Sequence, residues 1–599
     1  MHSNYTLIFW ILLLCGCIFA DVPTPHLQHP AVPYLNHAIW FQPLEIEVFG
    51  PDVSGMIPNH YSDVQWNPAF LTSLRQRSIY LGLAPGTNEP LGVTPYLDQL
   101  QSATAPASDY AVYPRWYNQT IVNPLNTTPI YQLAALLPLP QGWKISIFNR
   151  SFFDYGDFRA NDWWYGAGRW AEYDNALSDI PDGVYEPERL AIDDNQQQLR
   201  GTQTEINIAR SLSSELDAGL HVGHYIYGRD GTLYDSEWGN YPHSSFADLN
   251  DEDLDIDGTH WDIGGGLLYH TDEMTSFGIS GGFSRGQADQ ENGSLDTSYS
   301  WSEEALATDY YNLYSDHLDR NETHGTKVQR SYLSLQAEHK IGDRWRLRGF
   351  LHHSWATADL NGGIHSIDTS YSDRVYDTWD SGQDRYFQQR CEAHSSYLEN
   401  LTGSGTETQK DLRFFLSLIY QPADQWSFFT GIVVRNLSSE IKVYEDKNYR
   451  YSNYKEYTLY DYYSRRKYYR FHKEYEYRAD QNQWSLRLPV GVKANVVKGL
   501  QILLGADIRL YFEDSSQQAQ ILYPHITERQ WINGSLQQED IQTDRYEEYQ
   551  SDPATDFERS TNLQFGAIYQ HPSGARLYIK SADELLDLNN WEIGFEFSW

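Results

Sequence analysis

The chain ends in Trp591-Glu592-Ile593-Gly594-Phe595-Glu596-Phe597-Ser598-Trp599, where large apolar residues alternate with charged, small or hydroxylic ones. A β-strand has a period of two residues, so the five apolar side chains share one face of a strand. Lipid outside and water inside favour this alternation in a membrane β-barrel. A half-buried strand of a soluble β-sandwich alternates as well, and this stretch alone leaves that alternative open. The apolar face of the predicted closing strand carries Trp591, Ile593, Phe595, Phe597 and Trp599.

Alternating segments recur in pairs from about residue 129 onward, and tight turns rich in Gly, Pro, Asp and Ser join the two members of each pair. Polar stretches of roughly 30–50 residues separate the pairs, much longer than ordinary connections. Short turns at one end and long loops at the other are typical of outer-membrane barrels. The stretches expected as extracellular loops are 229–258, 285–327, 359–411, 439–483 and 513–560.

The pattern therefore predicts an all-β fold, a transmembrane antiparallel up-and-down β-barrel of about 14–16 strands, with 16 as the best count. Its first strand is expected at residues 78–83. The apolar run 7–19, which ends at Ala20, predicts an export signal (1–20) cleaved after Ala20. Cys17 leaves a lipoprotein signal open. Residues 21–70 are expected to form an irregular plug or a periplasmic arm, and residues 71–599 the barrel.

Composition narrows the classes of function. The formal net charge of −37 argues against nucleic acid as a partner, because nucleic acid needs a basic surface. Beyond the signal, Cys391 is the one cysteine, so the mature chain can form no internal disulfide. The 46 Tyr, 24 Phe and 19 Trp suit the aromatic girdles of a barrel and equally suit carbohydrate binding.

Charged residues alternate with apolar ones in several predicted strands. They should face the lumen, because an Arg at the midplane of the bilayer costs about 2–4 kcal/mol. We interpret them mainly as cross-strand ion pairs, with a charged conduction path as the alternative. The expected lumen residues are Arg346, Arg348, Arg487, Lys493, Asp507, Arg509, Glu592 and Glu596.

The segment before the first expected strand contains many prolines, which prevent long regular elements, together with Trp40, Phe41 and Phe49. Asn67-Pro68-Ala69 follows it. This signature resembles that of the outer-membrane long-chain fatty-acid and hydrocarbon transport family, in which the motif closes an N-terminal plug and leads into strand one. The resemblance implies a plugged barrel and an apolar substrate. A periplasmic arm would have the same composition.

Two other segments could bind ligands. Asp253, Asp255 and Asp257 match the opening of a calcium loop, but the twelfth position is Gly264 instead of Glu, so they are weak metal candidates. Residues 444–478 interleave Lys and Arg with many Tyr, a pattern that can bind nucleic acid or sugars or can hold the phosphates of lipopolysaccharide. The same pattern also occurs in an ordinary external loop in contact with acidic neighbours. We find no nucleophile, zinc or phosphate-loop motif, so we expect neither an enzyme nor a cofactor.

These observations predict an integral protein of a Gram-negative outer membrane that lets small, apolar molecules pass a plug. Its expected partners are membrane lipid, lipopolysaccharide, the barrel-assembly machinery and the small-molecule substrate. Three alternatives stay open: a polar porin, a non-conducting structural or adhesive barrel acting through its extracellular loops, and a secreted carbohydrate-active enzyme.

Overall fold

The structure is a computed structural model that describes residues 22, 25, 43–49, 53–83, 131–156, 170–174, 188–241, 243–304, 307–380, 382–459, 462–551, 554–582 and 591–599. The expected signal, its cleavage after Ala20 and Cys17 all lie outside these residues. No helix in the described part is both long and apolar enough to cross a membrane.

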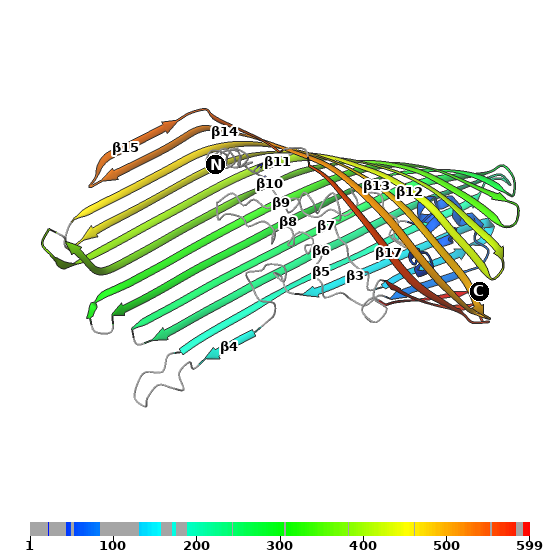
Figure 1. Ribbon diagram of the computed structural model, residues 1–599, viewed down its shortest axis with the longest axis horizontal. Helices are drawn as coiled ribbons and strands as arrows, with labels where there is room; N and C mark the ends of the chain where they lie inside the picture. The colour runs from blue at the N-terminus through cyan, green and yellow to red at the C-terminus, as the bar shows by residue number, and fades with distance from the viewer. Residues whose placement is uncertain are drawn as a thin grey trace, which may run out of the picture.

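Antiparallel strands form one sheet that closes on itself (Figure 1). Sixteen strands make the ring, as expected. β4 is added to the far part of β5, and β15 and β16 are added to the far part of β14. The strands are β1 (Ser78–Leu83), β2 (Tyr131–Pro138), β3 (Trp143–Gly156), β4 (Trp170–Asp174), β5 (Glu188–Ser211), β6 (Leu216–Tyr241), β7 (Ser244–His270), β8 (Thr275–Glu304), β9 (Ala307–Ile341), β10 (Trp345–Asp380), β11 (Arg385–Ala423), β12 (Trp426–Thr458), β13 (Tyr463–Val497), β14 (Leu500–Ile532), β15 (Ser535–Gln542), β16 (Arg545–Gln550), β17 (Ala554–Gln570), β18 (Ala575–Ala582) and β19 (Trp591–Ser598).

The ring closes through β1, which pairs with β19 on one side and β2 on the other. Its six residues are the ones that the sequence predicted for the first strand. Closure leaves no unpaired sheet edge inside the membrane, where an unsatisfied backbone N–H or C=O would cost several kcal/mol. The all-β membrane barrel is thereby confirmed.

The long polar stretches differ from expectation, because they continue the strands instead of forming loops. β10 stays in register with β11 from Trp345 to Asp380, which includes much of the expected loop 359–411. Backbone hydrogen bonds form a ladder whatever the polarity of the side chains, so a segment rich in polar residues can continue a strand. Turns at the far end are short, such as Asn533-Gly534 between β14 and β15.

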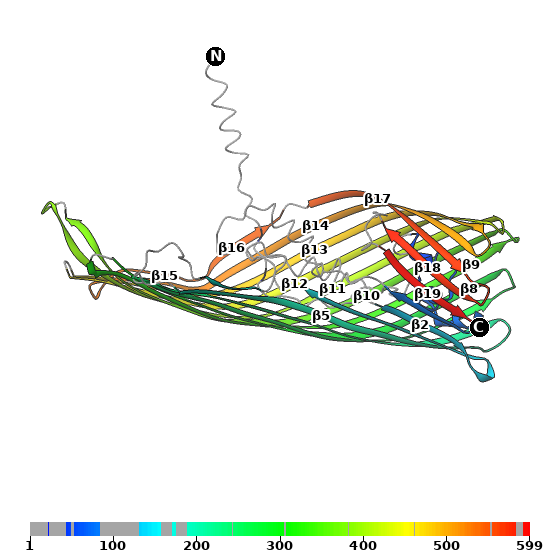
Figure 2. The same ribbon diagram turned by 90° about the horizontal axis from the view of Figure 1, so that it is seen from below.

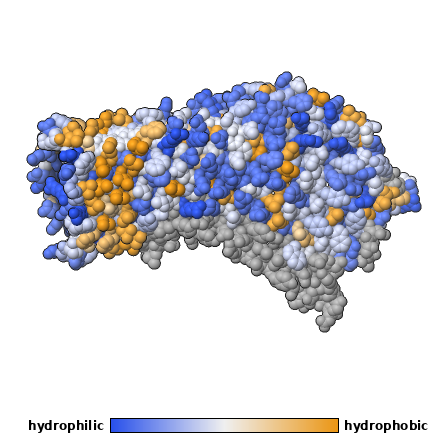
Figure 3. Space-filling view, turned by 180° about the vertical axis from the view of Figure 1, so that it is seen from behind, coloured by the Kyte–Doolittle hydropathy of each residue, from blue (hydrophilic) through white to orange (hydrophobic). Residues whose placement is uncertain are grey.

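Exposed apolar side chains are concentrated in the part of each strand that lies nearest the short turns, and on the face drawn in Figure 3 they form a band across one end. Further along, the outer face of β10 is polar and exposes Thr357, Asp359 and Asn361. A belt of this kind fits the bilayer, and the remaining sheet extends far beyond it. Members of the belt include Ile79, Leu133, Ile147, Ile206, Leu220, Ile263, Ile279, Leu335, Leu347, Phe414, Phe428, Leu504, Leu577 and Phe595.

The strands differ greatly in length around the ring. β18, β19, β1 and β2 have eight residues or fewer, whereas β11 has 39. The short strands complete the ring near the membrane belt, and the long ones continue as a curved sheet that is open on one side (Figure 2). The fold therefore has a closed membrane part and an open, trough-shaped outer part.

The closing strand generates the first prediction. Phe597 and Trp599 are 39% and 48% exposed on the lipid side. Replacing both by Asp should abolish most insertion, because two carboxylates would enter the lipid face of the strand that closes the ring. Heat-modifiable migration on gels measures the folded fraction. Replacing Ser213 and Ser214, in an exposed turn, by Asp should leave migration unchanged, and normal migration of the first variant would contradict the barrel assignment.

A second prediction concerns orientation. Epitope tags inserted after Gln383 or Gly534, in far turns, should bind antibody on intact cells. A tag after Gly342, in a short turn, should bind only after the outer membrane is broken, because barrels place short turns in the periplasm. Equal labelling at Gly342 on intact cells would mean that the trough points inward.

Candidate functional site

An N-terminal segment lies inside the closed part of the barrel. This inner segment, residues 43–49 and 53–74, contains helices α2 (Leu44–Glu47) and α3 (His60–Trp66) and the 3₁₀ helix η1 (Pro68–Ser73). It packs in one apolar cluster with inward-facing strand residues such as Tyr80, Phe350 and Phe415. Burying each large apolar side chain contributes about 1.5–3 kcal/mol. Its buried apolar members are Leu44, Ile46, Val48, Phe49, Val53, Met56, Tyr61, Val64, Trp66, Leu71 and Leu74.

Asn67 joins α3 to η1 and fixes both to the barrel wall. Its Oδ1 accepts a hydrogen bond from the backbone N–H of Ala69 (3.0 Å) and so caps the helix that starts at Pro68. Its Nδ2 donates to the Leu267 carbonyl (3.1 Å) and to Gln336 Oε1 (3.0 Å). A wholly buried amide with these bonds explains why Asn is needed at this position of Asn67-Pro68-Ala69.

Glycines in the wall allow this close approach. A β-carbon on Gly266 would lie 2.1 Å from Asn67 Oδ1, and one on Gly219 would lie 2.5 Å from the Pro68 carbonyl carbon. Either atom would displace the signature from the wall. β6 and β7 therefore carry glycines at the points where the inner segment contacts them.

A second group of glycines receives the earlier part of the segment. A β-carbon on Gly491 would lie 2.1 Å from the Phe49 ring, and one on Gly431 would lie 2.2 Å from Met56 Cε. The Phe49 ring also meets Phe429 edge-on, with centroids 5.8 Å apart. Phe49 thus lies in the barrel interior, whereas Trp40 and Phe41 lie outside the described residues.

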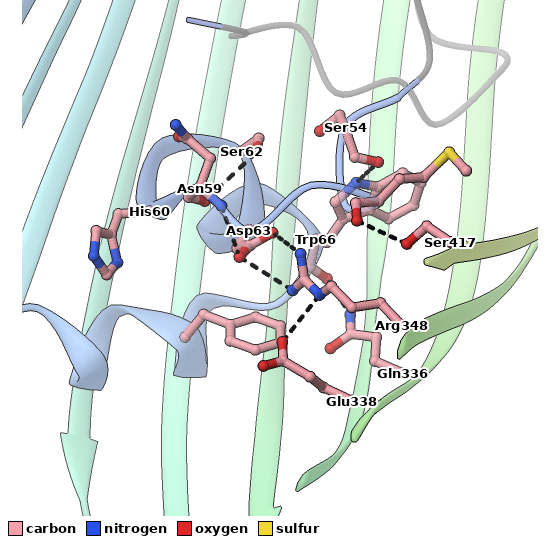
Figure 4. A network of polar contacts seen from close by, with 12 residues as sticks. Ser54, Asn59, His60, Ser62, Asp63, Trp66, Gln336, Glu338, Arg348 and Ser417 are labelled. Atoms are coloured by element: carbon pink, nitrogen blue, oxygen red, sulfur yellow. Dashed lines mark hydrogen bonds and ion pairs between the residues drawn. The ribbon is translucent and has the colours of Figure 1, made fainter. Parts of the chain in front are cut away.

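A buried ion pair holds α3 to β10 (Figure 4). Arg348 Nη1 and Nη2 donate to the two Asp63 carboxylate oxygens, each at 3.1 Å, and Arg348 Nε lies 3.0 Å from Glu338 Oε2. Burial raises the pKa of Asp63, and the charge and hydrogen bonds of Arg348 oppose that shift. A guanidinium that binds a carboxylate through two bonds fixes direction as well as distance, so it orients α3 in the lumen.

Trp66 anchors the end of α3. The indole Nε1 of Trp66 donates to the Ser54 carbonyl (3.0 Å), and Ser280 Oγ donates to the backbone carbonyl of Trp66 (2.6 Å). The ring meets Phe415 edge-on at 5.4 Å. Nearby, burial and the Glu596 carboxylate raise the pKa of Tyr61, which keeps its phenol neutral as a donor to Ser78 Oγ (2.8 Å).

The charged residues expected in the lumen face inward, and each has a partner. Arg487 pairs with Asp507, and Lys493 Nζ reaches Glu45 Oε1 of α2 at 2.5 Å. The remaining contacts are Arg346 with Glu338 (3.6 Å), Glu592 with Lys580 (3.0 Å), Glu596 with Arg576 (3.4 Å) and Arg509 over the Tyr511 ring (5.2 Å). They form cross-strand and strand-to-segment contacts, and we find no row of unpaired charge among them.

The weak calcium candidates do not form a loop. Asp253, Asp255 and Asp257 lie in β7 and alternate with the buried Ile256, so the three aspartates share the outer face of the strand. Residues two apart on a strand are about 6.8 Å apart, too far for three carboxylates to converge on one ion. Among the described residues, Asp446, His472 and Glu474 bring possible ligand atoms within 4.8 Å of one another, also on the outer face.

Sequence reasoning missed Asp63, Trp66 and the wall glycines. A signal was available for the glycines, because Gly264-Gly265-Gly266 and Gly281-Gly282 interrupt otherwise good strands. No sequence signal joins Asp63 to Arg348, which is 285 residues away.

No protein-family model matches the chain, and no curated protein matches it. Among solved structures, the toluene transporter TodX of Pseudomonas putida is similar at 12% identity and a TM-score of 0.30, over 80% of this chain and 95% of that one. A FadL homologue of Pseudomonas aeruginosa is similar at 8% identity and a TM-score of 0.21, over 92% and 98% of the two chains. These values are too low to carry an argument about function.

Proposed function

We propose that this protein is an outer-membrane channel through which small molecules pass, with the inner segment as its plug. One observation supports the proposal: the inner segment packs inside the ring at the level of the membrane belt and is fixed there by Asn67 and by the Asp63–Arg348 pair. A barrel of this strand number encloses a lumen wide enough for water unless something fills it.

The proposed substrate is small and apolar. The resemblance carried by Asn67-Pro68-Ala69 implies it, and the wall around Trp66 supports it, because Phe350 and Phe415 line that wall. The opposite charges of each ion pair in the lumen neutralise each other, and this disfavours a polar porin that selects solutes by charge. An outer-membrane location would require assembly by the barrel-assembly machinery and contact with lipopolysaccharide.

A structural or adhesive barrel is the second candidate. It is favoured by the long trough, since strands of 33–39 residues exceed the roughly 10 residues that a bilayer requires. The two candidates differ in one property, because an adhesive barrel conducts nothing whether or not the inner segment is in place.

The ion pair gives a test by substitution. Arg348→Met should raise the permeability of proteoliposomes to a small apolar dye severalfold, because leaving Asp63 buried without its partner costs about 3–5 kcal/mol and loosens the segment. Asp63→Asn should act more weakly, since Arg348 keeps Glu338. Arg346→Gln, at a half-exposed partner of the same Glu338, is the matched control and should change nothing. Equal dye flux in all four proteins would contradict the role of the pair.

Deleting residues 21–66 tests the plug itself. The barrel should still fold, because its strands satisfy one another's backbone hydrogen bonds. Heat-modifiable migration checks this, and single-channel conductance of the purified protein should then rise from near zero to that of an open pore. A folded deletion variant that conducts no more than the full chain would favour the structural or adhesive barrel.

A further inference from the structure

A pocket of about 670 Å³ lies near the far ends of β10–β13, remote from the inner segment. Seven of its nine lining residues belong to the basic, tyrosine-rich stretch that stands out in the sequence between 444 and 478. Its size suits a ligand of one or two rings. The lining residues are Tyr376, Gln389, Tyr451, Asn453, Lys455, Tyr457, Tyr463, Arg465 and Lys467.

The strand register places the pocket on the concave face of the trough. Tyr451 to Tyr457 have the same parity along β12 as Val443 and Glu445, which are buried on the inner face. The opposite residues of β13 follow without a shift, with Lys455 facing Arg465 and Tyr457 facing Tyr463. From the belt residue Ile432 to Tyr451 is about 65 Å along the strand at 3.4 Å per residue. Phosphates of the membrane surface therefore lie far below, and a ligand must arrive from the medium.

The pocket is cationic in a strongly acidic protein. It contains Lys455, Arg465 and Lys467 and no carboxylate, although the chain carries a net charge of −37. In the described part of the chain, no Asp or Glu forms an ion pair with these three. Arg465 Nη2 donates to Gln530 Oε1 at 3.1 Å, while its Nε is buried without a hydrogen-bond partner. Three like charges held together raise one another's energy, and a bound anion removes that cost.

The other lining groups restrict what carries the anion. Four tyrosines supply ring faces and hydroxyls, and the rings of Tyr457 and Tyr463 are 5.7 Å apart. Asn453 adds an amide that both donates and accepts. Aromatic faces with hydroxyl and amide groups suit the apolar faces and hydroxyls of sugar rings, whereas a hydrocarbon would leave these polar groups unpaired.

We propose that this pocket binds a dissolved saccharide that carries sulfate or phosphate groups. Arg465 and the two lysines bind the anionic group, and the tyrosines pack against the sugar. This site is independent of the proposed channel function, because the inner segment contributes no residue to it.

The test is calorimetric titration of the full chain in detergent with a sulfated disaccharide, its unsulfated parent and inorganic sulfate. We expect the sulfated disaccharide to bind at least about tenfold more tightly than either, since the two kinds of contact add, and to bind more weakly as salt rises. Lys455→Gln with Lys467→Gln should lower that affinity about tenfold or more. Lys340→Gln with Lys498→Gln, near the short turns, is the matched control and should keep it.

A third variant separates the sugar from the charge. Tyr457→Leu keeps an apolar side chain but loses the aromatic face, so it should weaken the disaccharide and leave inorganic sulfate unaffected. Heat-modifiable migration of every variant confirms folding. The proposal is overturned if no sulfated disaccharide binds, if inorganic sulfate binds equally well, or if the lysine variant and its control have the same affinity. Dye flux and conductance report separately on the channel.

Discussion

The structure depends on one constraint, that every backbone N–H and C=O in the bilayer must find a partner in the protein. The six residues of β1 meet it by pairing with β19 and β2 at once, although β1 and β19 are more than 500 residues apart in the chain. Once this ring exists, the alternation of lipid-facing and lumen-facing side chains follows along all sixteen strands. The inner segment lies in the enclosed lumen, where its apolar side chains and those of the wall form one cluster.

Close contact between the inner segment and the wall is possible because the wall lacks side chains at selected points. Gly266, Gly491 and Gly505 each lie where a β-carbon would come within 2.1 Å of the inner segment. Glycine is a poor strand former, so these positions lower the intrinsic stability of the sheet. The loss is offset by hydrogen bonds from Asn67 and by burial of Phe49, which connects the sequence of the wall to that of the inner segment.

Much of the barrel could be predicted from the sequence, because lipid and water impose a period of two on Trp591–Ser598 and its counterparts. The first strand and the strand number followed from the same pattern. The outer trough could not, since stretches such as 359–411 are so rich in polar residues that their alternation is weak, although residues such as Leu360 and Leu401 are buried on the inner face. The Asp63–Arg348 pair could not be predicted from the sequence either, because it depends on how a non-strand segment lies inside a closed ring. The basic, tyrosine-rich stretch was visible as a composition, but its placement on the concave face required the register of β12 and β13.

Outside the bilayer, the sheet has to be stabilised by contacts other than lipid. Cross-strand ion pairs supply part of this, as between Lys447 of β12 and Glu399 of β11, whose Nζ and Oε1 lie 2.7 Å apart on the inner face. Tyrosines supply another part, as in the stacked rings of Tyr449 and Phe471, 4.6 Å apart. Both kinds of side chain can also bind solutes once they are left without a partner. A sheet built from charged residues and tyrosines therefore needs only a local excess of one charge, as at Lys455, Arg465 and Lys467, to become a binding surface.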